Sequence, residues 1–207
     1  MKIAVINEVS SCTKNPDVVK AFEQTGSTVL NLGMKTPEQK PELTYLHTAL
    51  MSALTLELGI ADMVIGGCGT GQGYLNAALQ FPGVVCAHVL QPLDAWLAKR
   101  INAPNCIALA LNQGYGWASD VNLRMIADVL CENTNAKGYP PAREESQTRS
   151  RVRLNTLSLD THKTLNEIVD IIEPQLVKEV MGSTDFRAAV RSADDCGLKN
   201  KLLKIEA

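Results

Sequence analysis

Five short apolar segments recur along the first two thirds of the chain, and each is followed by a segment whose apolar residues have helical spacing. This alternation predicts parallel strands, because a parallel connection needs a long return path and a helix supplies it. Right-handed crossovers then place helices on both faces of one sheet. The strand segments are Lys2–Asn7, Thr28–Leu32, Asp62–Ile65, Val84–Ala87 and Cys106–Leu111.

The segments between these strands carry helix signals. Asn15-Pro16 is a helix start and Gly26 is a C-cap position, while Leu43–Leu58 repeats its leucines at helical spacing. Shorter helices are expected over Tyr74–Leu79, Pro92–Arg100 and residues 120–131. The chain has 207 residues, of which 45% are hydrophobic, which is enough for the core of one domain with a tail. The predicted fold class is α/β, a Rossmann-like, doubly wound, parallel five-stranded sheet.

The character of the sequence changes after residue 137, so we divide it into a sheet domain over residues 1–137 and a helical tail over 138–207. Arginines crowd the start of the tail, at positions Arg143, Arg149, Arg151 and Arg153. A long amphipathic helix is expected next, with Pro174 kinking or restarting it. Its apolar stripe comprises Leu165, Ile168, Val169, Ile172, Leu176 and Val180. The stripe either packs on its own domain or reaches a second subunit, and the tail is predicted to take part in dimerisation.

Charge and motif content exclude several classes of protein. The net charge of −2 gives no general reason to bind nucleic acid or an anionic membrane, and no apolar run is long enough for a signal peptide or a membrane span. The three histidines and six cysteines lack metal-ligand spacing, so neither a zinc site nor a disulfide framework is expected. We therefore predict a cytoplasmic protein with free thiols, no metal and no cofactor.

The segment Gly66-Gly67-Cys68-Gly69-Thr70-Gly71-Gln72-Gly73 follows the third strand, at the edge where open α/β sheets bind ligands. No frame of it fits the dinucleotide pattern GxGxxG, because Gln72 or Tyr74 falls on the last glycine. It also lacks the lysine of a nucleotide phosphate loop. What remains is a turn whose amides, with a helix N-terminus, form an anion hole around a reactive residue.

Cys68 is the candidate reactive residue. Most cysteines are small buried hydrophobic residues, but backbone amides and a helix N-terminus beside Cys68 favour its thiolate form. A thiolate can take a proton from carbon, and adjacent amides can hold the enediolate that results. Thr70 supplies a hydroxyl two residues later. A binder without activity has no need of the thiol, and a redox role would need a resolving cysteine nearby in the sequence.

The order Ala-Asp-Met-Val-Ile-Gly-Gly-Cys-Gly-Thr-Gly-Gln-Gly, then Phe-Pro-Gly-Val-Val, then Asn102-x-x-Asn105 resembles the ribose-5-phosphate isomerase B family, which includes the galactose-6-phosphate isomerase subunits. The resemblance covers roughly residues 1–153. It implies a homodimer or a dimer of dimers and an enediol proton transfer without metal or cofactor. By this resemblance Cys68 is the base and Thr70 relays protons between two sugar oxygens. It also implies that the amides of Gly69, Gly71 and Gly73 form the anion hole and that Asn102 holds a substrate hydroxyl or carbonyl. The other residues expected around the substrate are Gln72, Asn7, Glu8, Tyr45, His47, His88, Arg143 and Arg149.

Three departures from the family pattern bear on the substrate. The first strand ends in Asn7-Glu8-Val9-Ser10 instead of Asp-His-Ala-Gly, and Ile101 stands where the ring-opening histidine precedes Asn102. The Arg-His-x-x-Arg that grips a terminal phosphate from the neighbouring subunit is absent, and Arg143 and Arg149 are its nearest counterparts.

These departures make the chain similar to the 4-deoxy-5-hexosulose-uronate ketol-isomerases, whose anionic substrate is an open-chain keto-uronate. A pentose or hexose phosphate remains the alternative substrate, with His88 as another proton source. A non-catalytic subunit that binds an anionic sugar remains the alternative of another class.

Overall fold

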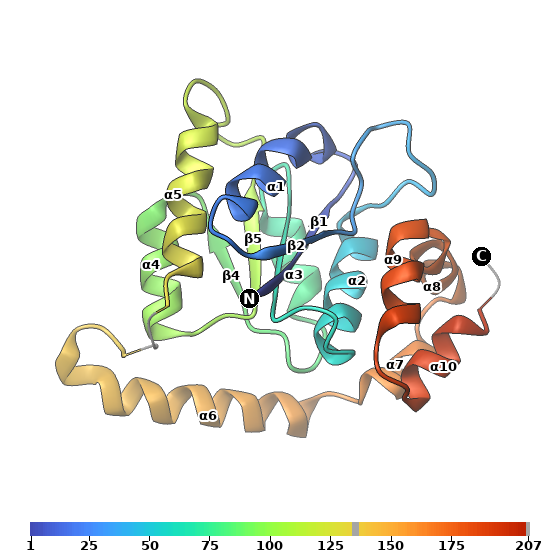
Figure 1. Ribbon diagram of the computed structural model, residues 1–207. Helices are drawn as coiled ribbons and strands as arrows, with labels where there is room; N and C mark the ends of the chain where they lie inside the picture. Colours follow the sequence, from blue (N-terminus) through green and yellow to red (C-terminus); the bar gives the residue numbers. More distant parts are fainter. Residues whose placement is uncertain (134–136, 206–207) are drawn as a thin grey trace.

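The protein was analysed as a computed structural model, which describes residues 1–133 and 137–205. Five strands form one parallel sheet in the order β2-β1-β3-β5-β4, which confirms the predicted fold class (Figure 1). The strands are β1 (Lys2–Asn7), β2 (Thr28–Asn31), β3 (Met63–Cys68), β4 (Cys86–Val89) and β5 (Cys106–Ala110). Every predicted strand is present: β1 has the predicted bounds, and the ends of the other strands differ from the prediction by at most three residues.

Helices cover both faces of this sheet. On one face α1 (Asn15–Glu23), α4 (Pro92–Ile101) and α5 (Ser119–Cys131) share a core with β1, β3 and β5. On the other face lie α2 (Tyr45–Glu57) and α3 (Gln72–Ala78). The chain therefore leaves β1 toward one face and β3 toward the other, although the two strands are neighbours. Open α/β sheets bind ligands where the strand order reverses in this way.

The end of the chain is a set of helices on the α2 side, comprising α7 (Leu165–Ile171), α8 (Pro174–Gly182), α9 (Thr184–Ser192) and α10 (Gly197–Leu203). The apolar stripe is divided between two helices, because the chain is extended at Ile172 and the helix restarts at Pro174, one of the two outcomes predicted for that proline. Buried side chains such as Leu165, Val180 and Phe186 belong to the same core as α2. These helices therefore pack on their own domain.

Helix α6 (Glu144–Thr161) follows the short helical turn Pro141–Arg143 and differs from the rest, because none of its residues is buried. It runs along the edge of the sheet where the strands begin (Figure 1). Ser158 Oγ accepts from the amide of Gly83 at 3.1 Å, and the Arg151 guanidinium donates to the carbonyl of Ile101 at 3.0 Å. Apolar side chains on α6 are nevertheless exposed, namely Val152, Leu154, Leu157 and Leu159.

None of the helices in residues 1–133 and 137–205 is both long enough and apolar enough to cross a lipid bilayer.

Candidate active site

Cys68 is the last residue of β3, and its register partner is Ala110 at the end of β5. The preceding Gly67 pairs with Asn7 at the end of β1. Three strand ends therefore meet around the thiol, at the edge of the sheet where the strand order reverses. Cys68 is buried, with 8% of its surface exposed at this edge of the sheet.

Two glycines of the turn are required by backbone conformation and by close neighbours. Gly71 has a φ of +74°, and a Cβ placed there would lie 2.6 Å from the Nε2 atom of His88. Gly67 has a φ of +149°, and a Cβ there would overlap the carbonyl oxygen of Leu109. Side chains are strained in this region of φ, so the turn that presents Cys68 depends on glycine at both positions.

The residue after Cys68 is held on both sides by neighbouring loops. The Gly69 amide donates to Ser10 Oγ at 3.0 Å, and the Gly69 carbonyl accepts from the Asn112 amide at 2.8 Å. The Asn112 side chain then donates to the Ser10 carbonyl at 2.9 Å. We call this closed set of hydrogen bonds the Ser10–Gly69–Asn112 triangle. Sequence reasoning missed both Ser10 and Asn112, and the only signal for them was that each follows a predicted strand.

Other amides of the turn have no such partner. Within the part of the chain that the structure describes, no acceptor is paired with the amides of Thr70, Gly71 or Gly73, whereas the Gln72 amide donates to Thr70 Oγ1 at 3.4 Å. Of the three amides expected to form an anion hole, those of Gly71 and Gly73 are unpaired, whereas the Gly69 amide donates to Ser10.

His88 and Tyr45 flank the turn, as expected. The Nε2 atom of His88 lies 2.9 Å from the Thr70 carbonyl, and since a carbonyl only accepts, this nitrogen carries the proton. The ring of Tyr45, the first residue of α2, lies close to Gly73, where an added Cβ would be 3.2 Å from the ring. Both side chains are thus within the same strand-end surface as Cys68.

The two residues at the end of β1 differ in what they face. Asn7 is 1% exposed, and its side-chain oxygen accepts from Asn15 at 2.9 Å, within a group of asparagines that also includes Asn31. Asn7 is therefore buried and already engaged by Asn15, and its predicted substrate contact stays a prediction. Glu8 is 4% exposed and accepts a short hydrogen bond from Ser10, so its carboxylate is part of the surroundings of the turn.

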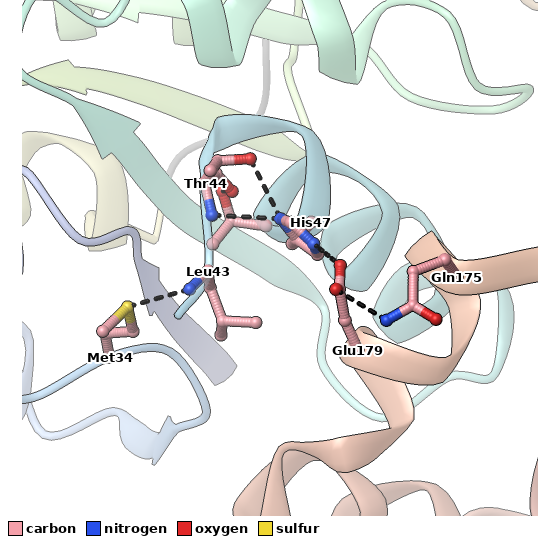
Figure 2. A network of polar contacts seen from close by, with 7 residues as sticks. Met34, Leu43, Thr44, His47, Gln175 and Glu179 are labelled. Carbon is pink, nitrogen blue, oxygen red and sulfur yellow. Dashed lines mark hydrogen bonds and ion pairs between the residues drawn. The ribbon is translucent and has the colours of Figure 1, made fainter. Parts of the chain in front are cut away.

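His47 also has partners other than a substrate. Its Nδ1 atom accepts from the Thr44 amide at 3.0 Å, capping α2, so its Nε2 atom carries the proton. Nε2 then donates to Glu179 of α8 at 2.6 Å, and Gln175 donates to the other carboxylate oxygen (Figure 2). Both ring nitrogens thus have partners within the chain, Nδ1 at the cap of α2 and Nε2 on α8. A substrate contact of His47 stays a prediction.

We expect His47→Ala to lower the free energy of unfolding by about 1–2 kcal/mol, because a capping bond and a partly buried bond to Glu179 are lost. The hydrogen bond from Gln175, and then that from His47, hold the pKa of the Glu179 carboxyl below its usual value. Because the pKa of Glu179 is lower in the folded than in the unfolded chain, its carboxylate stabilises the fold at any pH above the unfolded-state pKa. This stabilisation is lost as the pH falls through the folded-state pKa.

The difference in stability between wild type and His47→Ala should therefore shrink below about pH 4. Urea unfolding at several pH values measures it. If His47→Ala has unchanged stability but a raised KM, His47 contacts the substrate instead.

Asn102, Arg143 and Arg149 lie far from Cys68 within one chain. Asn102 precedes β5 by four residues, whereas Cys68 pairs with the end of that strand, which spans about 13 Å. Arg143 and Arg149 belong to the α6 region on the same side as Asn102, and Arg149 forms an ion pair with Glu145. The separation of Asn102 from Cys68 could have been predicted from the sequence, because Asn102 precedes a predicted strand and Cys68 follows one.

A cavity of about 390 Å³ lies between α6 and the sheet on that opposite side. Asn102 and His162 line it together with apolar side chains such as Leu154 and Leu157. The predicted substrate residues are therefore divided between two surfaces of the protomer. One surface carries the thiol with the unpaired amides, and the other carries Asn102 near the arginines.

A buried polar column behind the turn is structural. Tyr74 of α3 places its ring where a Gly66 side chain would be, and its hydroxyl lies 2.6 Å from Ser52 Oγ and 3.2 Å from Cys106 Sγ. Burial raises the pKa of Tyr74 well above its usual value. The hydroxyl therefore stays protonated at neutral pH and is no candidate for a base. In residues 1–133 and 137–205 no group of three or more His, Cys, Asp or Glu side chains is arranged to hold a metal ion.

Comparison with known proteins agrees with this arrangement. A family model described as Ribose/Galactose Isomerase matches residues 3–136. The crystal structure of a ribose-5-phosphate isomerase from Vibrio parahaemolyticus is 34% identical with a TM-score of 0.93, covering 99% of this chain and 98% of that chain. The structure of a 4-deoxy-L-threo-5-hexosulose-uronate ketol-isomerase complexed with a tartrate is 33% identical, with the same TM-score and coverage.

A ribose 5-phosphate isomerase from Thermotoga maritima shares the fold at 22% identity, with a TM-score of 0.62 over 75% of this chain and 97% of that chain. No curated protein sequence matches. The family model covers well over half of the 207 residues, and the two structures that match nearly the whole chain are both of sugar isomerases. The chain therefore belongs to the Ribose/Galactose Isomerase family and is a sugar isomerase.

Proposed function

We propose that this protein is a cofactor-independent ketol-isomerase that acts on an open-chain keto-uronate, with Cys68 as the base. The observation that carries the proposal is a turn in which Cys68 stands beside unpaired amides and no acid replaces the ring-opening histidine, since Ile101 occupies that position. A ketol-isomerase of such a uronate is similar to this chain over nearly its whole length and binds a tartrate, which is a small hydroxy-dicarboxylate.

The proposed reaction moves one proton between carbons and one between oxygens. The Cys68 thiolate takes the proton from C2 of the hydroxy-aldehyde, and the electrons of that bond form the enediolate. The unpaired amides of the turn hold the negative oxygen on C1. Thr70 passes the proton of the C2 hydroxyl to that oxygen, and the Cys68 thiol returns its proton to C1. The product carries a ketone at C2, and the thiolate is regenerated.

A sugar phosphate is the alternative substrate. The ribose-5-phosphate isomerase from Vibrio parahaemolyticus is as similar to this chain as the ketol-isomerase, so overall likeness does not separate the two. His88 favours this alternative, because its protonated Nε2 atom lies beside the turn and its ring is a possible acid for ring opening. A non-catalytic, sugar-binding subunit is the alternative of another class.

We further propose that the active site is completed by a second copy of the chain. Asn102 and the arginines of α6 lie on the opposite side of the sheet from Cys68, so one protomer cannot bring them together. A homodimer that joins these two surfaces would do so, and the exposed apolar residues of α6 offer area for such an interface. A dimer of dimers and a cytoplasmic location also stay predictions.

Mixing two inactive variants tests the completed site. Cys68→Ala and Asn102→Ala should each lose activity, but a mixed dimer has one site with both residues intact. Random exchange of subunits should therefore restore about a quarter of wild-type activity. Native mass spectrometry of the mixture checks that mixed dimers have formed. Mixed dimers without any regained activity would place Cys68 and Asn102 in different sites or in none.

The substrate proposal is tested by a panel of pentose phosphates, hexose phosphates and keto-uronates incubated with the enzyme in heavy water. An enediol mechanism incorporates deuterium at the carbon next to the carbonyl, which NMR detects. A non-catalytic subunit would bind a compound of the panel and label none of them.

A further inference from the structure

The Ser10–Gly69–Asn112 triangle joins three loops that the chain order separates widely. Ser10 follows β1, Gly69 follows β3, and Asn112 follows β5. The carbonyl of Cys68 itself accepts from the Leu111 amide at 3.1 Å, beside the triangle. The Cys68–Gly69 peptide group is thus held through both its carbonyl and its amide, and the following Gly69–Thr70 peptide group is held through its carbonyl.

The protons of the triangle can be assigned. Ser10 has a single hydroxyl proton, which it donates to the Glu8 carboxylate, so the lone pairs of its Oγ atom are left to accept from Gly69. Glu8 is 4% exposed and belongs to the end of β1, so the direction of the Ser10 hydroxyl is set by a group that packing holds in place. Ser10 is itself exposed, so its side chain contributes little to the core.

This arrangement has two consequences for the turn. The Gly69 amide is already used, so it is not offered to a substrate anion. The carbonyl of the same residue accepts from the backbone amide of Asn112, which restricts the rotation of Gly69, although glycine is the most permissive residue. The Asn112 side chain holds Ser10 through the Ser10 carbonyl. The position of the Cys68 thiol relative to the unpaired amides then depends on the side chains of Ser10 and Asn112, which need not touch the substrate.

We propose that Ser10 and Asn112 are positioning residues that hold Cys68 in line with the proton it removes. The inference rests on the proposed function in one respect, the role of Cys68 as the base. Small displacements of a reacting group lower rates strongly, and a displacement of about 1 Å can cost a hundredfold. Loss of a single hydrogen bond that orders a turn shifts the equilibrium between its ordered and open forms about fivefold.

The test compares Ser10→Ala with Ser10→Thr, which keeps the hydroxyl, and with Ser11→Ala as the matched control. Ser11 is the next residue, and its hydroxyl approaches the Glu8 carbonyl and not Gly69. We expect Ser10→Ala to lower kcat about tenfold with KM within a factor of two. Asn112→Ala should act in the same direction, and Ser10→Thr and Ser11→Ala should stay within a factor of two of wild type.

A second readout does not need turnover. Iodoacetamide alkylation of Cys68, followed by mass spectrometry of its peptide across a range of pH, should be about fivefold faster in Ser10→Ala, because the loosened turn exposes the thiol more often. Unchanged alkylation in Ser10→Ala overturns the proposal, even if kcat falls, because the hydroxyl would then act on the substrate directly. The two proposals can also be told apart. If Ser10→Ala is alkylated faster but the wild-type protein incorporates deuterium into no compound of the panel, the positioning role is supported and the proposed function is overturned.

Discussion

Cys68→Ala is expected to lower turnover at least about a hundredfold, which is the usual contribution of a general base. Only the thiol that removes the carbon-bound proton is lost, while the unpaired amides of the turn remain. The substrate should therefore bind with nearly wild-type affinity, and the melting temperature should change little because the substitution removes a single sulfur atom at the end of β3. Deuterium incorporation and calorimetric binding measure the two effects separately.

Cys196→Ala is the matched control, since Cys196 is an exposed free cysteine at the start of α10 and lies outside the site. It should leave turnover unchanged. Cys68→Ser is expected to keep at most a trace of activity, because an alkoxide forms much less readily than a thiolate beside the same amides. Residual activity of Cys68→Ala above about one hundredth of wild type would assign the base to another group.

An open-chain keto-uronate is expected to exceed ribose 5-phosphate in kcat/KM by at least about a hundredfold, the typical worth of one acid–base group. A cyclic sugar phosphate has to be opened by a proton delivered to its ring oxygen, and isoleucine has no proton to deliver. Ile101 is the last residue of α4, next to Asn102, so it would act on the site of the second subunit. Steady-state kinetics on the two compounds measure the ratio.

Ile101→His should raise kcat/KM on ribose 5-phosphate and leave the rate on the linear substrate nearly unchanged, if ring opening limits the reaction. The Ile101 carbonyl, which accepts from Arg151, is unaffected by this change of side chain. Ile101→Gln serves as the control, because it adds polarity without an acid. Efficient turnover of ribose 5-phosphate by the wild type would contradict the open-chain argument and point to His88 as the acid.

The sequence allowed the fold and the centre of the site to be predicted, because both are written in local patterns. Alternating strand and helix periodicity predicts a doubly wound parallel sheet, and the observed strand order has that form. The glycine turn could be assigned because positive φ angles and close approach demand glycine at Gly67 and Gly71. Cys68 lies between them, so it could be identified as the candidate reactive residue without the tertiary structure.

The partners of these residues could not be predicted, because they depend on which strand ends lie side by side. Ser10 is separated from Gly69 by 59 positions and from Asn112 by 102, yet the strand order brings all three together. His47 is 132 positions from Glu179, and this contact between α2 and α8 has no signal in the local sequence. Helical periodicity also marked the apolar stripe of the tail without saying what it covers.

The sequence by itself therefore determined a doubly wound sheet with a reactive cysteine in a glycine turn, since periodicity and backbone freedom are properties of neighbouring residues. Only the tertiary structure decided which amides of that turn are unpaired and which side chains hold it in place. It also decided that Asn102 and the arginines of α6 lie at the other edge of the sheet from Cys68. The physical reason is that parallel strands send residues before and after them to opposite edges, and the pairing of strands distant in the chain then sets every contact at each edge.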